Sequence, residues 1–335
     1  MKRFALATAL LWAPFSAVAS PSVSGIVADH ILPRFEALAG AAQDLALSAR
    51  ADCAPTSANL RAAYHTAFDA WVSASHLRFG PTEIDERAFA LAFWPDSRGA
   101  TPRTLTGLIT QQDPIALDPD AFSEVSIAAR GFYALEFLLY DDALMEVGTA
   151  RFRCRLVQTV TADIAATAGA IHEDWMSGQV DVLLSPGPQS IYRTEEDVLQ
   201  DMLRALSTGL QFTQDTRLGR PLGTYDRPRP TRAEAWRSGR SRAHVVLSLS
   251  ALQDLAARLS ASDARLSARL AGQFDAALSR LDTLNDPVFA GVAAPQSRIR
   301  IEAISQAIGT IRATVQTDLG PTLGVVAGFN ALDGD

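Results

Sequence analysis

Three oxygen-bearing side chains, Tyr133, Glu136 and Tyr140, interrupt an otherwise apolar stretch in the middle of the chain. Residues three and seven positions apart lie on one face of a helix, so their oxygens are expected to form a single stripe. Neighbouring Phe132 and Leu135 have the spacing of buried helical positions. A buried carboxylate without a partner is costly, so Glu136 is expected to meet an ion pair, a metal or a functional site.

If a metal binds here, the phenol of Tyr133 and the carboxylate of Glu136 are hard oxygen donors, which favour ferric iron over zinc. His76, which lies beside Arg78, is the best candidate to add an imidazole ligand. The alternative is structural. In that case an arginine, either Arg130 or one from another helix, holds Glu136, and Tyr133 is a core residue whose hydroxyl finds a backbone partner.

Two irregular segments offer further ligand-binding residues. Asp96 lies in a stretch rich in proline, glycine and aromatic residues, and such segments are often functional; the alternative is a loop that only caps the end of a bundle. Ser238 is predicted to cap a helix, which places Arg237 and Arg240 where they can meet an anion or pair with Glu136.

Most of the chain consists of long amphipathic segments rich in alanine, leucine and arginine, and we find no strand pattern. Ser57 and the Thr194-x-x-Asp197 capping box mark two helix starts. Thr101 followed by a proline marks a third. Helices are predicted at about 26–49, 57–79, 101–112, 120–140, 147–176, 194–215, 238–259, 262–284 and 296–319. The fold class is therefore all-α, with up-and-down helical bundles.

The chain is longer than a single hydrophobic core usually supports, so two domains are expected. Residues 1–19 have a basic start, an apolar run and a small-residue cleavage site, which indicates a signal peptide and a periplasmic protein. The clearest break in the rest of the chain lies at 183–190 and contains two prolines and a glycine. We therefore predict helical bundles at 20–185 and 186–335.

Charge and cysteine content narrow the possible partners. The full chain has a net charge of -7, and removal of Lys2 and Arg3 with the signal peptide leaves 28 arginines against 37 acids, or -9. This acidity argues against nucleic acid and anionic membrane surfaces as partners. Cys53 and Cys154 are the only cysteines, and in an oxidising compartment they are expected to form one disulfide.

The pattern Gly131-x-Tyr133-x-x-Glu136 resembles the Gly-x-His-x-x-Glu motif of the imelysin-like proteins, bacterial envelope proteins linked to iron, with tyrosine in place of the motif histidine. Four other stretches of the chain share this resemblance: 76–81, 93–96, 217–222 and 236–239. The resemblance implies two packed helical bundles. It also places Gly131 in the ligand site and adds weight to iron as a ligand or cofactor.

The function expected from these observations is the binding of iron or another small ligand by an exported protein. The protein is expected to be monomeric, with other envelope proteins as further candidate partners. A metallopeptidase using the same pocket is one alternative, because the imelysin family has been grouped with peptidases. It is the weaker one, because Tyr133 removes a principal ligand from a water-activating zinc site. An envelope scaffold without a small ligand is the other alternative.

Overall fold

The computed structural model describes residues 21–325, and within this range the chain is helical, with no β-strand. The prediction of an all-α protein is therefore confirmed. None of the described helices combines the length and the apolar character that crossing a bilayer requires. The predicted signal peptide, residues 1–19, lies outside the described residues.

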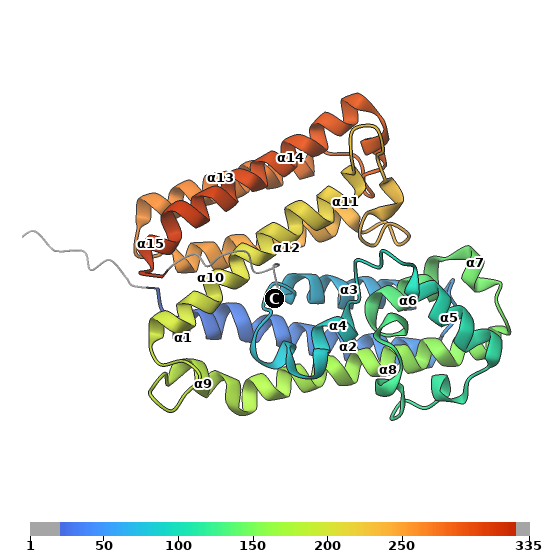
Figure 1. Ribbon diagram of the computed structural model, residues 1–335. Coiled ribbons are helices and arrows are strands. Elements are labelled where there is room, and N and C mark those ends of the chain that lie inside the picture. Colours follow the sequence, from blue (N-terminus) through green and yellow to red (C-terminus); the bar gives the residue numbers. More distant parts are fainter. Residues whose placement is uncertain (1–20, 326–335) are drawn as a thin grey trace, which may run out of the picture.

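The helices gather in two groups that lie one above the other (Figure 1). In the first group, α2 packs against α3 and α8, and α6 also packs against α8. The first group runs in this order: α1 (Val23–Ile26), α2 (Leu32–Ala51), α3 (Ala58–Ala74), α4 (Arg87–Leu91), α5 (Ala100–Gln111), α6 (Gly131–Tyr140), α7 (Asp142–Met145), α8 (Ala150–Asp174) and α9 (Val180–Leu184).

In the second group, α13 packs against both α12 and α14, and α10 also packs against these two helices. The second group consists of α10 (Glu195–Gln211), α11 (Gly219–Leu222), α12 (Ser241–Leu259), α13 (Ala264–Asp282), α14 (Pro295–Thr314) and α15 (Gly320–Thr322). A π-helical segment, Phe212–Leu218, joins α10 to α11. The contact between α3 and α12 links the second group to the first.

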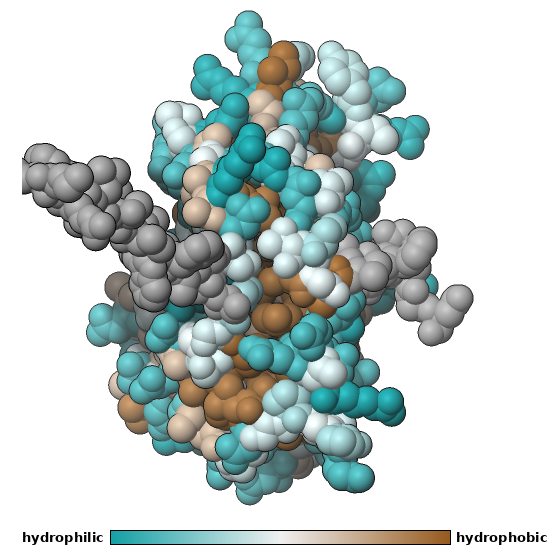
Figure 2. Space-filling view, turned by 90° about the vertical axis from the view of Figure 1, so that its left-hand side faces the viewer, coloured by the Kyte–Doolittle hydropathy of each residue, from teal (hydrophilic) through white to brown (hydrophobic). Residues whose placement is uncertain are grey.

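One continuous cluster of buried apolar side chains runs through both groups. The chain crosses from the first group to the second between α9 and α10, which is where the boundary at 185/186 was predicted. Because the core is shared, the division into two independently folding domains stays a prediction. Figure 2 shows the side of the molecule on which α9 lies in Figure 1. Hydrophobic residues gather at the surface near the middle of this face.

Several helix starts follow the local rules of the sequence. The side chain of Ser57 accepts a hydrogen bond from the Leu60 N–H at the start of α3, and Thr194 and Asp197 form the predicted capping box of α10. The Thr101 cap was wrong. Asp96 accepts hydrogen bonds from the first amides of α5 instead, which moves the start of the helix back to Ala100.

The predicted disulfide between Cys53 and Cys154 is present, with 5.1 Å between the two Cα atoms. It joins the chain just after α2 to the first turns of α8. These two helices already pack along their lengths, so the bond locks the end of an existing contact.

Replacing both Cys53 and Cys154 with serine is expected to lower the free energy of unfolding by about 2–5 kcal/mol, because the bond closes a loop of roughly a hundred residues in the unfolded chain. Urea unfolding of the oxidised wild type and the double variant measures this loss. Reduced wild-type protein is the matched control and should behave like the variant. Thiol titration of unreduced, denatured wild type should find no free thiol, and finding two would contradict the assignment.

Candidate functional site

The motif glycine owes its place to a close backbone contact. Gly131 has φ +72°, and a Cβ at this position would lie 2.2 Å from the backbone oxygen of Leu91. Only glycine fits there. Helix α6 therefore begins at Gly131, and not near residue 120 as predicted; the preceding residues form short 3₁₀ turns. The structure thus gives Gly131 a positioning role, in which it brings α6 close to α4.

Tyr133 and Glu136 are both buried on α6, and both line a cavity between the two groups of helices. The cavity has a volume of about 220 Å³. Five aromatic residues and three arginines contribute to its wall, and we call it the aromatic pocket. Its lining comprises Phe93, Trp94, Asp96, Ser97, Gly99, Thr101, Pro102, Tyr133, Glu136, Phe137, Arg220, Thr231, Arg232, Ala233, Ala235, Trp236 and Arg237.

The hydroxyl of Tyr133 donates a hydrogen bond of 2.5 Å to Oε1 of Glu234, a buried acid that the sequence analysis did not single out. The other oxygen of Glu234 accepts from Nε of the buried Arg217 at 2.7 Å. The Nδ1 atom of His244 lies 3.3 Å from the same oxygen. Tyr133 is therefore joined to an ion pair from the second group of helices.

The charges around Glu234 fix its ionisation state. Burial alone raises the pKa of Glu234, but Arg217 and His244 outweigh this effect and lower the pKa to about 2. The pKa of Tyr133 is raised well above its usual value, by burial first and then by the charge of Glu234. Glu234 is therefore a carboxylate and Tyr133 a neutral phenol at neutral pH.

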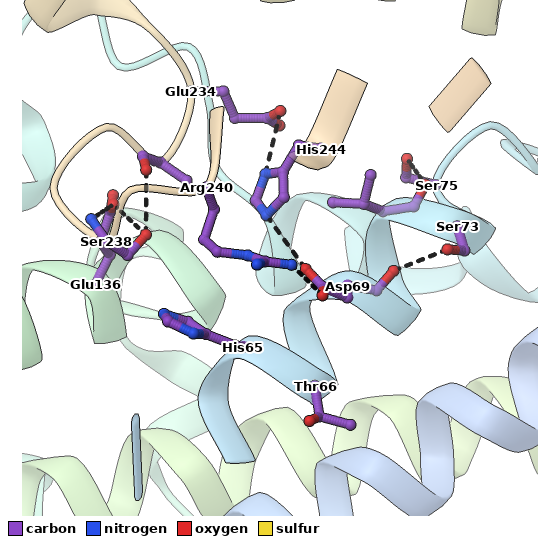
Figure 3. Close-up of polar contacts among 12 residues, drawn as sticks. His65, Thr66, Asp69, Ser73, Ser75, Glu136, Glu234, Ser238, Arg240 and His244 are labelled. Atoms are coloured by element: carbon purple, nitrogen blue, oxygen red, sulfur yellow. Dashed lines mark hydrogen bonds and ion pairs between the residues drawn. The ribbon is translucent and has the colours of Figure 1, made fainter. Parts of the chain in front are cut away.

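No arginine in residues 21–325 pairs with Glu136, so the predicted ion pair with Arg237 or Arg240 is wrong. Its Oε1 atom accepts hydrogen bonds from the N–H of Ser238 at 2.9 Å and from the hydroxyl of Ser238 at 2.8 Å (Figure 3). Burial raises the pKa of Glu136, and the two bonds from Ser238 oppose this rise. The other carboxyl oxygen, Oε2, takes no hydrogen bond from any residue in 21–325, and Glu136 lines the aromatic pocket.

The predicted arginine partners bind other acids. Arg237 Nε pairs with Asp141 at 2.8 Å, and the guanidinium lies 3.9 Å from the centre of the Phe137 ring, at the edge of the aromatic pocket. Arg240 pairs with Asp69, and Nε2 of His244 is 3.8 Å from the same acid (Figure 3). The pairing prediction failed because α12 begins only at Ser241, so Ser238 does not cap this helix.

The remaining predicted residues are dispersed. Arg130 pairs with Asp163 on α8. Arg78 forms a half-exposed ion pair with Glu83, and neither lines the aromatic pocket. Tyr140 turns away from Tyr133, and its hydroxyl lies 2.9 Å from Nε2 of His65.

His76 is buried in a separate polar cluster. Its Nε2 lies 2.8 Å from Nε2 of His30, and Nδ1 of His30 lies 2.7 Å from Oδ2 of Asp254 on α12. When both rings are neutral and His30 donates to Asp254, His76 must donate to His30. Burial, reinforced by nearby Arg34, lowers the pKa of both histidines, that of His30 to about 4. The structure does not bring His76 to Tyr133 and Glu136.

Asp96 and Trp94 connect the predicted loop to the pocket. Asp96 lines the aromatic pocket, although its oxygens accept from the amides of Ala100 and Thr101. The Trp94 ring stacks on Tyr133 with 6.0 Å between ring centres, and the guanidinium of Arg220 lies over the Trp94 ring, 5.7 Å from its centre. The loop therefore caps α5 and also forms a wall of the aromatic pocket, and its role in ligand binding stays a prediction.

The donor atoms do not form a ready site for a bare metal ion. The Tyr133 hydroxyl is a proton donor to Glu234, and one oxygen of Glu136 is bound to Ser238. Among the described residues, no group of three or more His, Cys, Asp or Glu side chains is placed to hold a metal. Sequence reasoning missed Glu234 because it lies in an irregular loop, and the only available signal was an acid among many arginines.

Comparison with known proteins places these observations in context. A model of the imelysin family matches residues 31–315. An imelysin-like protein from Psychrobacter arcticum 273-4 has a similar fold, with a TM-score of 0.75, 20% identity and coverage of 92% of this chain and 96% of that one. An iron-regulated protein A precursor from Parabacteroides distasonis ATCC 8503 gives a TM-score of 0.66 at 14% identity, covering 90% and 98%. None of the curated proteins matches this chain.

The two buried acids are expected to respond differently to neutralisation. Glu234→Gln should lower the free energy of unfolding by about 3–5 kcal/mol, because it leaves Arg217 buried without a countercharge. Glu136→Gln keeps an oxygen that can accept from Ser238, so a loss below about 1 kcal/mol is expected. Urea unfolding of this matched pair measures both values. Equal losses would contradict the assignment of Glu234 as the ion-paired acid.

The histidine pair predicts a pH dependence of stability. The folded pKa of His30 is about 4, below its ordinary value of 6.5, so the unfolded chain binds more protons between these values. The stabilising contribution of neutral His30 should be fully present above pH 6.5 and should fall by up to about 1.4 kcal/mol per pH unit as the pH drops towards 4. The pKa of His76 is also lowered, so this residue should add to the loss.

Urea unfolding across this pH range tests the histidine pair. The double variant His30→Gln/His76→Gln should have a shallower pH slope, whatever its stability at neutral pH. An unchanged slope in this variant would show that other groups carry the dependence.

Proposed function

Because this chain belongs to the imelysin family, we propose that it is an exported binding protein that takes an iron-related small ligand into the aromatic pocket. One observation carries this proposal: Glu136 is buried in the wall of the pocket, and one of its oxygens is left without a hydrogen bond within residues 21–325. This oxygen is open to the pocket, so a ligand there can supply the hydrogen bond that the described chain does not.

The wall of the aromatic pocket suits an organic ligand. Trp94, Trp236 and Phe137 supply flat apolar surface, and Arg220 and Arg232 supply positive charge from the second group of helices. Binding sites for small molecules combine apolar walls with a few convergent polar groups in this way. The small volume, about 220 Å³, favours a compact ligand over a peptide.

Iron is proposed to arrive as a chelate that brings its own donor atoms. A bare ferric ion would need phenolate from Tyr133, but burial and Glu234 keep its pKa well above the usual value. An anionic chelate could instead use the arginines for charge and the oxygen of Glu136 for a hydrogen bond or a metal contact. The similar protein named for iron regulation makes iron the first cargo to test.

The same donor set favours binding over peptide hydrolysis. A catalytic zinc site usually combines three protein ligands with an activated water. The hydroxyl of Tyr133 is engaged by Glu234 and one oxygen of Glu136 by Ser238, which leaves a single carboxylate oxygen free. No histidine of residues 21–325 lines the aromatic pocket to add a ligand. Export rests on the signal-peptide pattern of residues 1–19 and agrees with the word precursor in the name of the similar protein.

Isothermal titration calorimetry with ferric nitrilotriacetate tests the proposal. The comparison is a titration with the iron-free chelator. We expect saturable binding that is tighter for the ferric form. Thr231→Trp places a large ring at the pocket wall without touching Glu136 or Glu234, and should weaken binding about tenfold or more, the equivalent of about 1.4 kcal/mol.

Thr310→Trp, at an exposed position on α14, is the matched control and should bind like wild type. No saturable binding of the ferric chelate, or equal weakening by both tryptophan variants, would contradict the proposal. Peptide cleavage that is sensitive to chelators and lost in Glu136→Gln would favour the peptidase alternative.

A further inference from the structure

Positive charge is concentrated in one part of this acidic chain. Residues 217–242 contain eight arginines but only two acids, Asp226 and Glu234, whereas the whole chain has a net charge of -7. Four of the eight arginines have partners. Arg217, Arg237 and Arg240 pair with acids, and Arg242 donates to the backbone oxygen of Leu281.

The other four arginines, Arg220, Arg227, Arg229 and Arg232, line one open pocket of about 540 Å³, which we call the arginine pocket. Their side chains form no ion pair or hydrogen bond with any residue in 21–325. Asp226 also lines the pocket, but it lies outside ion-pair distance of all four. The unpaired arginines of this segment are therefore the ones that converge on the pocket.

Arg220 lies deepest of the four. Its Nε atom is buried and has no hydrogen-bond partner, although the guanidinium lies over the Trp94 ring. Burial lowers the pKa of Arg220, and the charges of Arg232 and Arg229 lower it further. A buried donor without an acceptor is unfavourable, and so is uncompensated repulsion among like charges. An anion in the pocket would offset the repulsion among the arginines.

The backbone that carries these arginines is held in place. Gly223 has φ +55°, and a Cβ there would lie 2.4 Å from the backbone oxygen of Arg227, so the turn requires glycine. Buried Arg298, on α14, donates to the backbone oxygen of Leu222 at 2.8 Å. The N–H of Arg229 donates to the oxygen of Pro221, also at 2.8 Å. These contacts fix the loop before any ligand arrives, which lowers the entropy cost of binding.

We propose that the arginine pocket is a binding site for a small oxyanion with two or more negative charges, either a phosphate or a polycarboxylate. Guanidinium groups suit both classes, because their planar donors match pairs of phosphate or carboxylate oxygens. Arg220 and Arg232 also line the aromatic pocket, so the two sites are contiguous. The proposal goes beyond the binding of an iron ligand and does not depend on it.

Calorimetric titration of the full protein tests the site. The titrants are pyrophosphate, citrate and acetate, all free of iron and at low ionic strength. We expect saturable binding of at least one multivalent anion and weaker binding of acetate. Whichever of pyrophosphate and citrate binds more tightly identifies the phosphate or the carboxylate class. Added salt should weaken binding, as expected for exposed charges.

The double variant Arg227→Gln/Arg229→Gln removes two pocket arginines that do not line the aromatic pocket. It should weaken binding of the preferred anion about tenfold or more, since hydrogen bonds to charged groups contribute this much. Arg155→Gln/Arg265→Gln is the control. It changes the net charge equally at exposed arginines on α8 and α13.

Three results would overturn the proposal: no saturable binding of either multivalent anion, acetate binding as tightly as both, or equal weakening by the two double variants. The assay contains no iron, so its outcome is separate from that of the ferric chelate experiment. Failure of either experiment therefore leaves the other interpretable.

Discussion

The buried carboxylate of Glu234 is the interaction on which the site depends. Removing a charge from water carries a large penalty, which is offset only when several donors meet it with good geometry. Here the partners come from separate elements. Arg217, from the π-helical segment after α10, and Tyr133, from α6, donate hydrogen bonds, and Nδ1 of His244, on α12, lies 3.3 Å away. The network can form only when the two groups of helices are packed in this arrangement. It therefore helps to fix how they pack, beyond what apolar burial alone would specify.

The same network determines what the pocket can offer a ligand. Arg217 and His244 hold Glu234 as a carboxylate, and Glu234 in turn keeps Tyr133 as a neutral donor. Within residues 21–325, Glu136 has no counter-cation at hydrogen-bond distance, and burial raises its pKa, so the two acids differ in how readily they take up a proton. Tyr133 thus has a structural partner, and of these two α6 residues Glu136 is the one that keeps an oxygen without a hydrogen bond within residues 21–325.

The sequence predicted the features that depend on local pattern. The helical fold, the capping box at Thr194, the disulfide between Cys53 and Cys154 and the burial of Tyr133 and Glu136 all follow from spacing, composition or resemblance. The hydrogen-bond partners of the buried side chains could not be predicted from the sequence in this way. Those of Tyr133 and Glu136 lie about a hundred residues away, in a loop with no periodic pattern. Such pairings are set by tertiary packing, which no local signal encodes.

After Lys2 the chain uses arginine and no lysine, so one residue type supplies the strong positive charges of both the core and the surface. A guanidinium stays charged when buried and presents several donors in a plane, so Arg217 can bind Glu234 through Nε while Nη1 points to the hydroxyl of Ser248 at 3.2 Å. A lysine could not bridge both groups in this fixed geometry. The same property gives unpaired arginines a binding capacity. When the planar donors of a guanidinium meet no acceptor within the fold, they remain available to an acceptor on a ligand. Within residues 217–242, the buried Arg217 is therefore satisfied inside the fold, whereas the four arginines around the arginine pocket form no ion pair with residues 21–325.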